Sequence, residues 1–139
     1  MFTDTTTIRV RYAETDQMGV VYHSHYLVYF EVARGDAVRH SGLTYADLEK
    51  KGVIMPIVEI NCRYLRPARY DNLLTIKTFL KEMPTDHKIT FHHEVYNEQN
   101  ELLTTAKVIL YFMDAQKMKP VKMPEVWAKK LQAYFNSPP

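Results

Sequence analysis

The stretch SHYLVYFEVARGDAVRHS, residues 24–41, decides the fold that we expect for this chain. Its apolar residues recur every three or four positions, which is the spacing of an α-helix. These residues are Tyr26, Leu27, Phe30, Ala33, Ala37 and Val38. We expect the Ser24 hydroxyl to cap the first turn, and Gly42 to end the helix as its C′ residue. Glu31 and Arg34 are three positions apart, so we expect them to pair on the helix surface.

Strands are expected on both sides of this helix. Before it, Thr6–Tyr12 alternates apolar and polar residues, the period of a half-buried strand. After it, Thr44 is expected to cap a short helix over Tyr45–Lys51. The remaining expected elements are strands over Val53–Leu65, Leu74–Leu80, Ile89–Val95 and Leu102–Phe112, and a final helix over Glu125–Phe135. The strand over Leu102–Phe112 has the longest apolar row, so we expect it at the centre of the sheet. Pro56 should place its own strand end at a sheet edge or a bulge.

This order of elements predicts an α+β fold. Turn residues recur about every dozen positions after the helices, which favours antiparallel hairpins over βαβ units. The sheet must then wrap the long helix to bury its apolar residues. We find no linker or repeat, so we expect a single domain spanning residues 1–139. One sheet of this size leaves part of the helix uncovered, which favours a dimer formed through a sheet edge or along the helix.

Composition excludes several classes of protein. The chain has 18 Lys and Arg against 16 Asp and Glu, a net charge of +2, which is too mild for a nucleic-acid-binding surface. No run approaches ~18 apolar residues, so we expect no membrane span. Residues 1–7 lack the features of a signal peptide, and we expect a cytoplasmic protein. Cys62 is the only cysteine, which excludes an internal disulfide and favours a small buried side chain.

Chemistry-bearing residues are concentrated in ETDQMGVVYHSHY, residues 14–26, the loop that leads into the long helix. The first amides of a helix have no intrahelical partner, so they can polarise a carbonyl and stabilise the oxyanion formed from it. Gly19 permits a tight turn or the close approach of a ligand. Asp16 could then attack the carbonyl or take a proton from water. An equally weighted interpretation is that Asp16 only caps a turn and that the histidines are surface residues.

We expect neither a metal nor a cofactor. His23 and His25 are two positions apart, which suits neither one helix face nor a tetrahedral zinc motif. His92 and His93 are adjacent in an expected strand, so their side chains point to opposite faces. Phosphate-binding glycine loops, the nucleophile elbow of serine hydrolases and the dinucleotide-binding fingerprint are all missing from the sequence.

Four segments together resemble a known family. They are RYAETDQMGVVYHSHY (11–26), Tyr29-Phe30-Glu31-x-x-Arg34, Tyr64-Leu65-x-Pro67-Ala68-Arg69-x-Asp71 and Asp114-x-x-Lys117-Met118-Lys119-Pro120. In this order they resemble the hot-dog-fold acyl-CoA thioesterases of the 4-hydroxybenzoyl-CoA thioesterase type. Within that type they are most similar to the Tol-Pal-associated acyl-CoA thioesterase subfamily.

The resemblance implies a hot-dog fold, in which a five-stranded antiparallel sheet wraps one long central helix. It also implies a homodimer, or a dimer of such dimers forming a homotetramer, with active sites at the dimer interface. The expected reaction is hydrolysis of a short-chain, medium-chain or aryl acyl thioester, carried on CoA or on acyl carrier protein. Asp16 would be the nucleophile or general base, and the His23 amide would stabilise the oxyanion.

The resemblance further implies two sets of binding residues. Those expected to contact the acyl group are Gly19, Tyr22, His25, Glu31, Val58 and Glu59, and those expected to meet the phosphates of CoA are Arg66, Arg69 and Lys119. His25 departs from the small or amide residue that relatives often carry, so it could narrow the entrance or carry a proton.

Two alternatives to a thioesterase stay open. One is a non-catalytic module that binds an acyl thioester or supports an assembly, although such a module has no need for Asp16 beside the carbonyl. The other is a hot-dog enoyl hydratase or dehydratase, which would use His23 or His25 together with Glu31. Turnover of an enoyl-CoA would favour the second, and binding without turnover the first.

Overall fold

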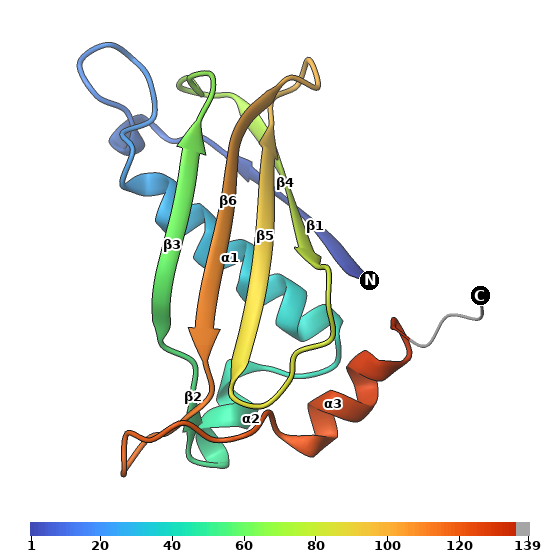
Figure 1. Cartoon of the computed structure of the whole chain (residues 1–139). Helices are drawn as coiled ribbons and strands as arrows, with labels where there is room; N and C mark the ends of the chain where they lie inside the picture. Colours follow the sequence, from blue (N-terminus) through green and yellow to red (C-terminus); the bar gives the residue numbers. More distant parts are fainter. Residues whose placement is uncertain (136–139) are drawn as a thin grey trace.

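Five strands form one twisted antiparallel sheet in the order β1-β4-β5-β6-β3 (Figure 1). The structure is a computed structural model in which residues 1–135 are described. The strands are β1 (Phe2–Arg9), β3 (Ile57–Tyr64), β4 (Leu73–Leu80), β5 (Lys88–Tyr96) and β6 (Leu102–Tyr111). Two helices, α1 (His25–His40) and α2 (Tyr45–Lys50), are inserted between β1 and β3. The order of elements is therefore the one expected from the sequence.

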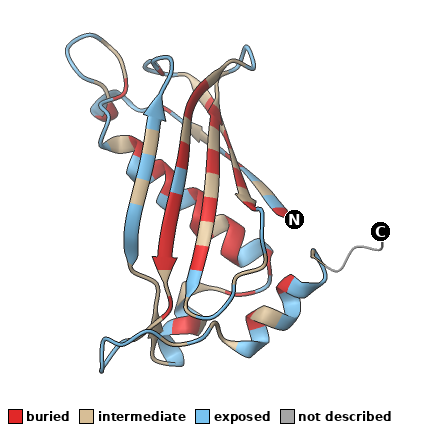
Figure 2. Ribbon diagram, viewed as in Figure 1, coloured by how far each residue is buried: buried red, intermediate tan, exposed pale blue. Residues whose placement is uncertain are grey.

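The long helix α1 lies across one face of the sheet and forms the centre of the core (Figure 1). Tyr26, Tyr29, Phe30 and Ala33 are among its buried residues. In β4 and β5, alternate residues are buried against it, because successive side chains of a strand point to opposite faces. Figure 2 shows these buried residues as red bands along the strands and the inner side of α1. The expected α+β hot-dog arrangement is confirmed.

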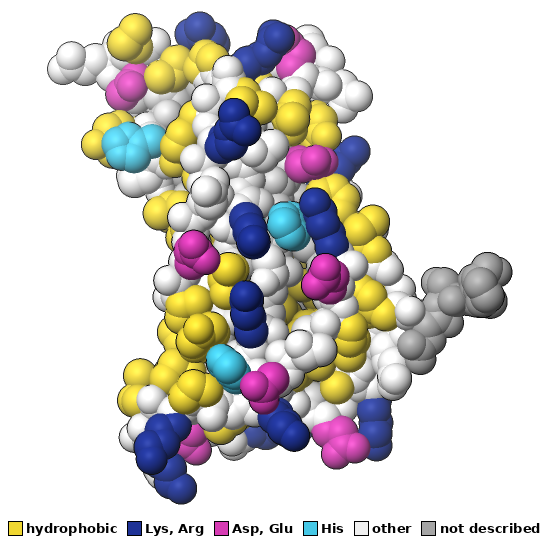
Figure 3. Space-filling view, viewed as in Figure 1, with side chains coloured by type: hydrophobic (Ala, Val, Ile, Leu, Met, Phe, Trp, Pro, Cys, Tyr) yellow, Lys and Arg dark blue, Asp and Glu magenta, His cyan; other side chains and the backbone are white. Residues whose placement is uncertain are grey.

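The opposite face of the sheet is exposed in Figure 3, where basic, acidic, histidine and hydrophobic side chains are interspersed. Its polar residues come from the outward-facing positions of β5 and β6, such as His92 and Lys107. Among residues 1–135, no helix is long and apolar enough to cross a membrane.

The two ends of α1 differ in how they are capped. Gly42 has a φ of 105°, and the amides of Gly42 and Leu43 donate to the carbonyls of Arg39 and Val38. This is the hydrogen-bond pattern of a Schellman motif, so the expected end of the helix is confirmed. The expected N-cap is wrong: Ser24 has helical φ and ψ, and its side chain makes no capping bond.

Two further expectations about α1 are wrong. Leu27 is 40% exposed, because it lies on the side of the helix that the sheet does not cover. Arg34 is 3% exposed and so does not pair with Glu31 on the surface, and no such ion pair occurs among the described residues. Burial lowers the pKa of Arg34, whereas the nearby Tyr45 and Glu31 raise it.

Several strands also differ from expectation in their boundaries or in their position in the sheet. β1 begins at Phe2 and ends at Arg9, because all eight residues pair in register with β4, and the chain then enters the short 3₁₀ turn η1 (Tyr12–Glu14). The expected strand Val53–Leu65 is divided at Pro56 into β2 (Val53–Ile54) and the edge strand β3. A register shift between Ile57 and Glu59 confirms the irregularity expected near this proline. β6 is an interior strand, but β5 holds the central position.

One end of the molecule is closed by apolar packing. There β2 pairs with β7 (Met113–Asp114), and α2 and α3 (Glu125–Gln132) lie beside them. Trp127 of α3 is fully buried, packs edge-on against Phe112 and donates to the Ser41 hydroxyl over 2.7 Å. The final helix ends three residues earlier than expected. At the other end of the sheet, the loop before α1 lies beside the β3–β4 turn (Figure 1).

Candidate active site

The loop before α1 is a closed turn built around Asp16. The Asp16 amide donates to the Val20 carbonyl over 2.9 Å, and the Gly19 amide donates to the Asp16 carbonyl over 3.0 Å. Gly19 has a φ of 77°, a conformation that side chains with a Cβ rarely adopt. The same turn fixes one carboxylate oxygen: Asp16 Oδ1 accepts from the amides of Met18 (2.8 Å) and Val20 (3.3 Å).

Asp16 therefore does cap a turn, as one interpretation of the sequence held, but this uses only one of its oxygens. Within residues 1–135, Oδ2 has no hydrogen-bond partner, and the residue is exposed. A carboxylate that is held by one oxygen and free at the other is oriented without being neutralised. It can therefore act on a bound group as a nucleophile or a base.

The loop is fastened to the turn that follows β3. The Val21 amide donates to the Ala68 carbonyl over 2.8 Å, and the Tyr70 amide donates to the Gly19 carbonyl over 3.3 Å. Ala68 is fully buried, which places this contact inside the core. The end of β3 and the entrance to α1 are thereby held as opposite walls of one pocket.

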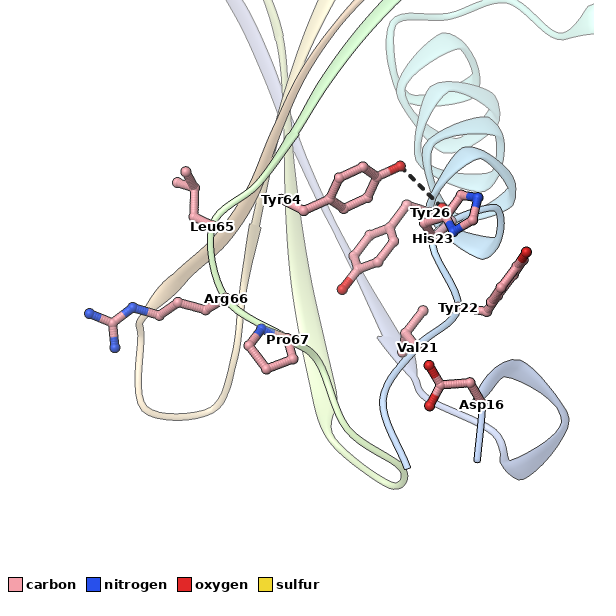
Figure 4. A pocket seen from close by; sticks show the side chains of 9 residues that line it. All are labelled: Asp16, Val21, Tyr22, His23, Tyr26, Tyr64, Leu65, Arg66 and Pro67. Carbon is pink, nitrogen blue, oxygen red and sulfur yellow. Dashed lines mark hydrogen bonds between the residues drawn. The ribbon is translucent and has the colours of Figure 1, made fainter. Parts of the chain in front are cut away.

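Free backbone amides lie at the start of α1. The His25 amide donates to the Tyr22 carbonyl, but in the described part of the chain the amides of His23 and Ser24 have no acceptor. On the other side of the pocket, the Tyr64 hydroxyl donates to the His23 carbonyl over 3.2 Å (Figure 4). This contact joins β3 to the helix entrance. The free amides are at the positive end of the helix dipole, where an oxyanion is stabilised.

Between these walls is an open pocket of about 370 Å³. Its lining residues are Asp16, Val21, Tyr22, His23, Tyr26, Tyr64, Leu65, Arg66 and Pro67 (Figure 4). The rings of Tyr26 and Tyr64 meet edge to face at 5.2 Å. Burial raises the pKa of Tyr64 to about 12, so its hydroxyl stays protonated and can donate. The pocket thus combines a carboxylate, free amides and an aromatic wall.

A second carboxylate supports the loop from inside. Glu14 is 5% exposed, and its Oε1 accepts from the Arg11 amide and from the Tyr29 hydroxyl, both over 2.8 Å. Its Oε2 accepts from the Arg11 guanidinium over 2.9 Å. Burial alone would raise the pKa of Glu14, but these hydrogen bonds outweigh it and lower the pKa. Glu14 is therefore a buried carboxylate whose oxygens are fully engaged.

The structure brings some of the expected site residues together and leaves others apart. Asp16, Tyr22, His23 and Arg66 line the pocket. Gly19 shapes the Asp16 turn, His25 is the first residue of α1, and Arg69 lies in an adjoining hollow that also contacts Arg66. Four residues lie away from the pocket of the single chain: Glu31, exposed on α1; Val58 and Glu59, exposed on the edge strand β3; and Lys119, in the loop after β7.

Sequence reasoning missed most of the pocket wall. Tyr64, Leu65 and Pro67 were used only as markers of a resemblance, although their position beside the Asp16 turn places them in the site. Tyr26 was assigned only to the core, yet it also lines the pocket. Glu14 had no role assigned to it within the loop segment. Its spacing of three positions from Arg11, whose amide and guanidinium both donate to the Glu14 carboxylate, was the available signal.

No group of three or more His, Cys, Asp or Glu side chains that could hold a metal ion is found within residues 1–135. His92 and His93 point to opposite faces of β5, as expected. His93 is 1% exposed, stacks on Phe30 at 4.8 Å and bonds through Nδ1 with the Thr78 hydroxyl.

Comparison with known proteins shows the family to which this chain belongs. A family model described as the thioesterase-like superfamily matches residues 10–131. The chain belongs to the thioesterase-like superfamily. The matched residues include the Asp16 turn, α1 and the whole of the β3–β6 region.

Individual relatives of this thioesterase-like chain are consistent with the family match. It is 37% identical over 127 residues to YneP of Bacillus subtilis, covering 91% of each chain. It is 34% identical over 118 residues to the acyl-CoA thioester hydrolase YbgC of Escherichia coli, covering 85% of this chain and 87% of YbgC. Among solved structures, it is similar to a DHNA-CoA thioesterase from Staphylococcus aureus, with a TM-score of 0.89 and 34% identity over 98% of this chain and 95% of that one.

Proposed function

We propose that this chain hydrolyses acyl-CoA thioesters to the free acid and CoA. The observation that carries the proposal is that one pocket is lined both by Asp16, which has a free carboxylate oxygen among residues 1–135, and by His23, whose amide at the helix start is free. Membership of the thioesterase-like superfamily and the names of YbgC and the Staphylococcus aureus enzyme support the same reaction.

In the proposed mechanism, the thioester carbonyl lies between Asp16 and the start of α1. The His23 amide donates to the carbonyl oxygen and binds the oxyanion of the tetrahedral intermediate more strongly than the ground state. Asp16 acts through Oδ2, because Oδ1 is held by the loop amides. The aromatic wall of Tyr22, Tyr26 and Tyr64 receives the acyl group.

Two routes are consistent with this arrangement. In the first, Asp16 Oδ2 attacks the carbonyl carbon, the C–S bond breaks, and CoA leaves as a thiolate that takes a proton from solvent. Water then cleaves the resulting mixed anhydride, returning the free acid and the carboxylate. In the second, Asp16 removes a proton from water and the resulting hydroxide attacks the carbonyl carbon. The C–S bond of the tetrahedral intermediate then breaks, and CoA leaves as a thiolate that takes the proton from Asp16.

We propose that a second copy of the chain completes the site. In the described part of the chain, β3 is an edge strand with one unpaired side, and its residues Ile57, Val58 and Glu59 are exposed. Pairing of two β3 strands would bring Val58 and Glu59 of one copy towards the pocket of the other. Glu31 and Lys119 are distant in the single chain, so a role for either would have to come from such a partner or from a dimer of dimers.

The remaining assignments are extensions of this proposal. Arg66 and Arg69 are placed to meet phosphates of CoA near the pocket mouth, although Arg66 also pairs with Glu101 over 2.6 Å. Acyl carrier protein is the alternative carrier, and the cytoplasm is the proposed location. Assignment to the Tol-Pal-associated subfamily rests on the sequence segments quoted above.

The test is thiol release from acetyl, medium-chain, long-chain and benzoyl CoA, with the same acyl groups on acyl carrier protein and with an enoyl-CoA. Turnover that peaks at one acyl group supports the proposal and begins to define the pocket. Acyl-CoA binding without any thiol release would indicate a binding module. Hydration of the enoyl-CoA without thiol release would indicate a hydratase.

A further inference from the structure

The buried carboxylate of Glu14 is not used by the proposed chemistry, yet it joins the start of the Asp16 loop to α1. It lies two positions before Asp16 in the chain, with only Thr15 between them. Its backbone carbonyl accepts from the Tyr22 amide over 2.9 Å, on the far side of the loop and next to His23. Its side chain accepts from Tyr29, which belongs to α1 itself.

We propose that Glu14 and Tyr29 are positioning residues that fix the separation between the Asp16 carboxylate and the first amides of α1. Asp16 and His23 are seven residues apart, and no hydrogen bond among the described residues joins them directly. Glu14 is connected to both residues. It precedes Asp16 in the chain, and its carbonyl accepts from the amide of Tyr22, the neighbour of His23. Tyr29 hydrogen-bonds Glu14 from within α1, so this junction between the loop and the helix start is also attached to the helix.

The energetics favour a rigid junction. Glu14 is almost completely buried, and a buried charge is tolerated only where its hydrogen bonds are satisfied. Both oxygens are engaged by donors on Arg11 and Tyr29. Since Tyr29 is itself 2% exposed, its hydroxyl has no water to replace this partner. Movement of the loop away from α1 would leave the Tyr29 hydroxyl unpaired in the core and Glu14 without its donor on α1.

A rigid junction matters because the rate of reaction depends steeply on geometry. The nucleophile and the oxyanion donor must face one carbonyl carbon from fixed directions, and a displacement near 1 Å can cost ~100-fold in rate. Apart from its own short hydrogen bonds, the largely exposed Asp16 turn is held by backbone contacts to the β3–β4 turn rather than to α1. The contact between Glu14 and Tyr29 is the buried side-chain hydrogen bond that links this loop to α1.

The experiment compares two tyrosine substitutions that each remove one oxygen. Tyr29→Phe removes the donor to Glu14, whereas Tyr45→Phe removes a partly buried hydroxyl on α2, at the closed end of the molecule. Steady-state kcat and KM on the best acyl-CoA are measured together with the melting temperature of each variant. Glu14→Gln is the third variant, because its amide keeps the shape but places N–H groups against the Arg11 guanidinium.

We expect Tyr29→Phe to lower kcat about 10-fold and Glu14→Gln about 100-fold, each with KM within about twofold of wild type. Tyr45→Phe should leave both constants within about twofold. A positioning role moves kcat at temperatures well below melting, which a purely structural role does not. Should Glu14→Gln fail to fold, Tyr29→Phe decides the question alone.

Folded Tyr29→Phe with wild-type kcat would overturn the inference, as would an equal loss in Tyr45→Phe. The inference rests on the proposed function, and the two can fail separately. If Asp16→Asn loses activity while Tyr29→Phe keeps it, only the positioning role is wrong. If wild type hydrolyses no acyl thioester, both are wrong.

Discussion

The two ends of this small hot-dog domain are built in opposite ways. At the closed end, α3 and the β2–β7 pair seal the sheet with an apolar cluster that includes Trp127, Phe112 and Leu131. At the pocket end, a carboxylate oxygen and backbone amides have no hydrogen-bond partner within residues 1–135 and lie among exposed side chains. The closed end is therefore held mainly by apolar packing, whereas the pocket end adds reactive groups to the second apolar cluster beneath it.

The difference indicates where substitutions should affect folding and where they should affect turnover. Unpaired polar groups cost little where water reaches them, and they are the groups that a substrate can engage. Apolar packing at the other end offsets the entropy of folding but presents no chemistry. The boundary lies near His93, which stacks on Phe30 from one apolar cluster and on Phe91 from the other.

The largest stability effect is expected at the closed end. Trp127→Ala removes a fully buried indole and the donor to Ser41, and it should lower the free energy of unfolding by about 3–5 kcal/mol. Urea denaturation followed by circular dichroism measures this. Thiol release per folded molecule should remain within about twofold of wild type. A loss below about 1 kcal/mol would show that the closed end does not hold the fold.

His93, which lies between the two apolar clusters, should make the stability of the fold depend on pH. Burial, together with the nearby Arg34 charge, lowers the pKa of His93 from 6.5 to about 3. Between these two values the unfolded chain binds a proton that the folded chain does not. The His93 contribution to stability is therefore complete above pH 6.5 and declines as the pH falls, by at most ~1.4 kcal/mol per unit. The slope between pH 6 and 4 should be smaller in His93→Phe, and an unchanged slope would contradict the buried neutral histidine.

A smaller effect is expected at the pocket wall. Tyr64→Phe removes the hydrogen bond to the His23 carbonyl, worth about 1 kcal/mol, and kcat/KM should fall roughly fivefold if that contact orients the helix entrance. Tyr70→Phe is the matched control, since Tyr70 is exposed and packs on Tyr12 rather than on the pocket. Equal kcat/KM values for the two variants would show that Tyr64 does not orient the helix entrance.

The smallest expected effects are the changes in stability on removing the hydroxyl at the start of α2 and at the start of α1. Thr44 caps α2 by accepting from the Asp47 amide over 3.1 Å, so Thr44→Ala should cost about 1 kcal/mol of unfolding free energy. Ser24 makes no capping bond at the start of α1, so Ser24→Ala should change stability by less than about 0.5 kcal/mol. Chemical denaturation of both variants under one condition provides the comparison. A larger loss in Ser24→Ala would mean that the hydroxyl caps the helix in solution.

Local sequence patterns predicted the elements well where spacing alone determines them. The helical period predicted α1, Gly42 predicted the end of α1, and Thr44 predicted the start of α2. Each of these signals depends only on residues that are close together in the sequence. The Ser24 cap failed for a tertiary reason: residues 20–23 are already held by the Asp16 turn and the β3–β4 turn, which leaves Ser24 in a helical conformation.

Contacts between distant segments could not be predicted in the same way. The start of β1 depends on pairing with β4, more than sixty residues away, and its threonine-rich sequence carries little apolar signal. Burial of Arg34 and Glu14 likewise depends on neighbours brought together only by folding. The placement of Asp16 and His23 in one pocket was predictable because one loop carries both, whereas Tyr64 lines that pocket from another strand.

The most direct test of the account is the turnover of Asp16→Asn on the best acyl-CoA, measured beside Asp86→Asn. Both replace an exposed turn carboxylate by its isosteric amide, but Asp86 lies in the turn between β4 and β5, away from the pocket. We predict at least a ~100-fold fall in kcat for Asp16→Asn, with melting temperature close to wild type, and no change for Asp86→Asn. Turnover of Asp16→Asn within a few-fold of wild type would contradict the assignment of the chemistry to this loop.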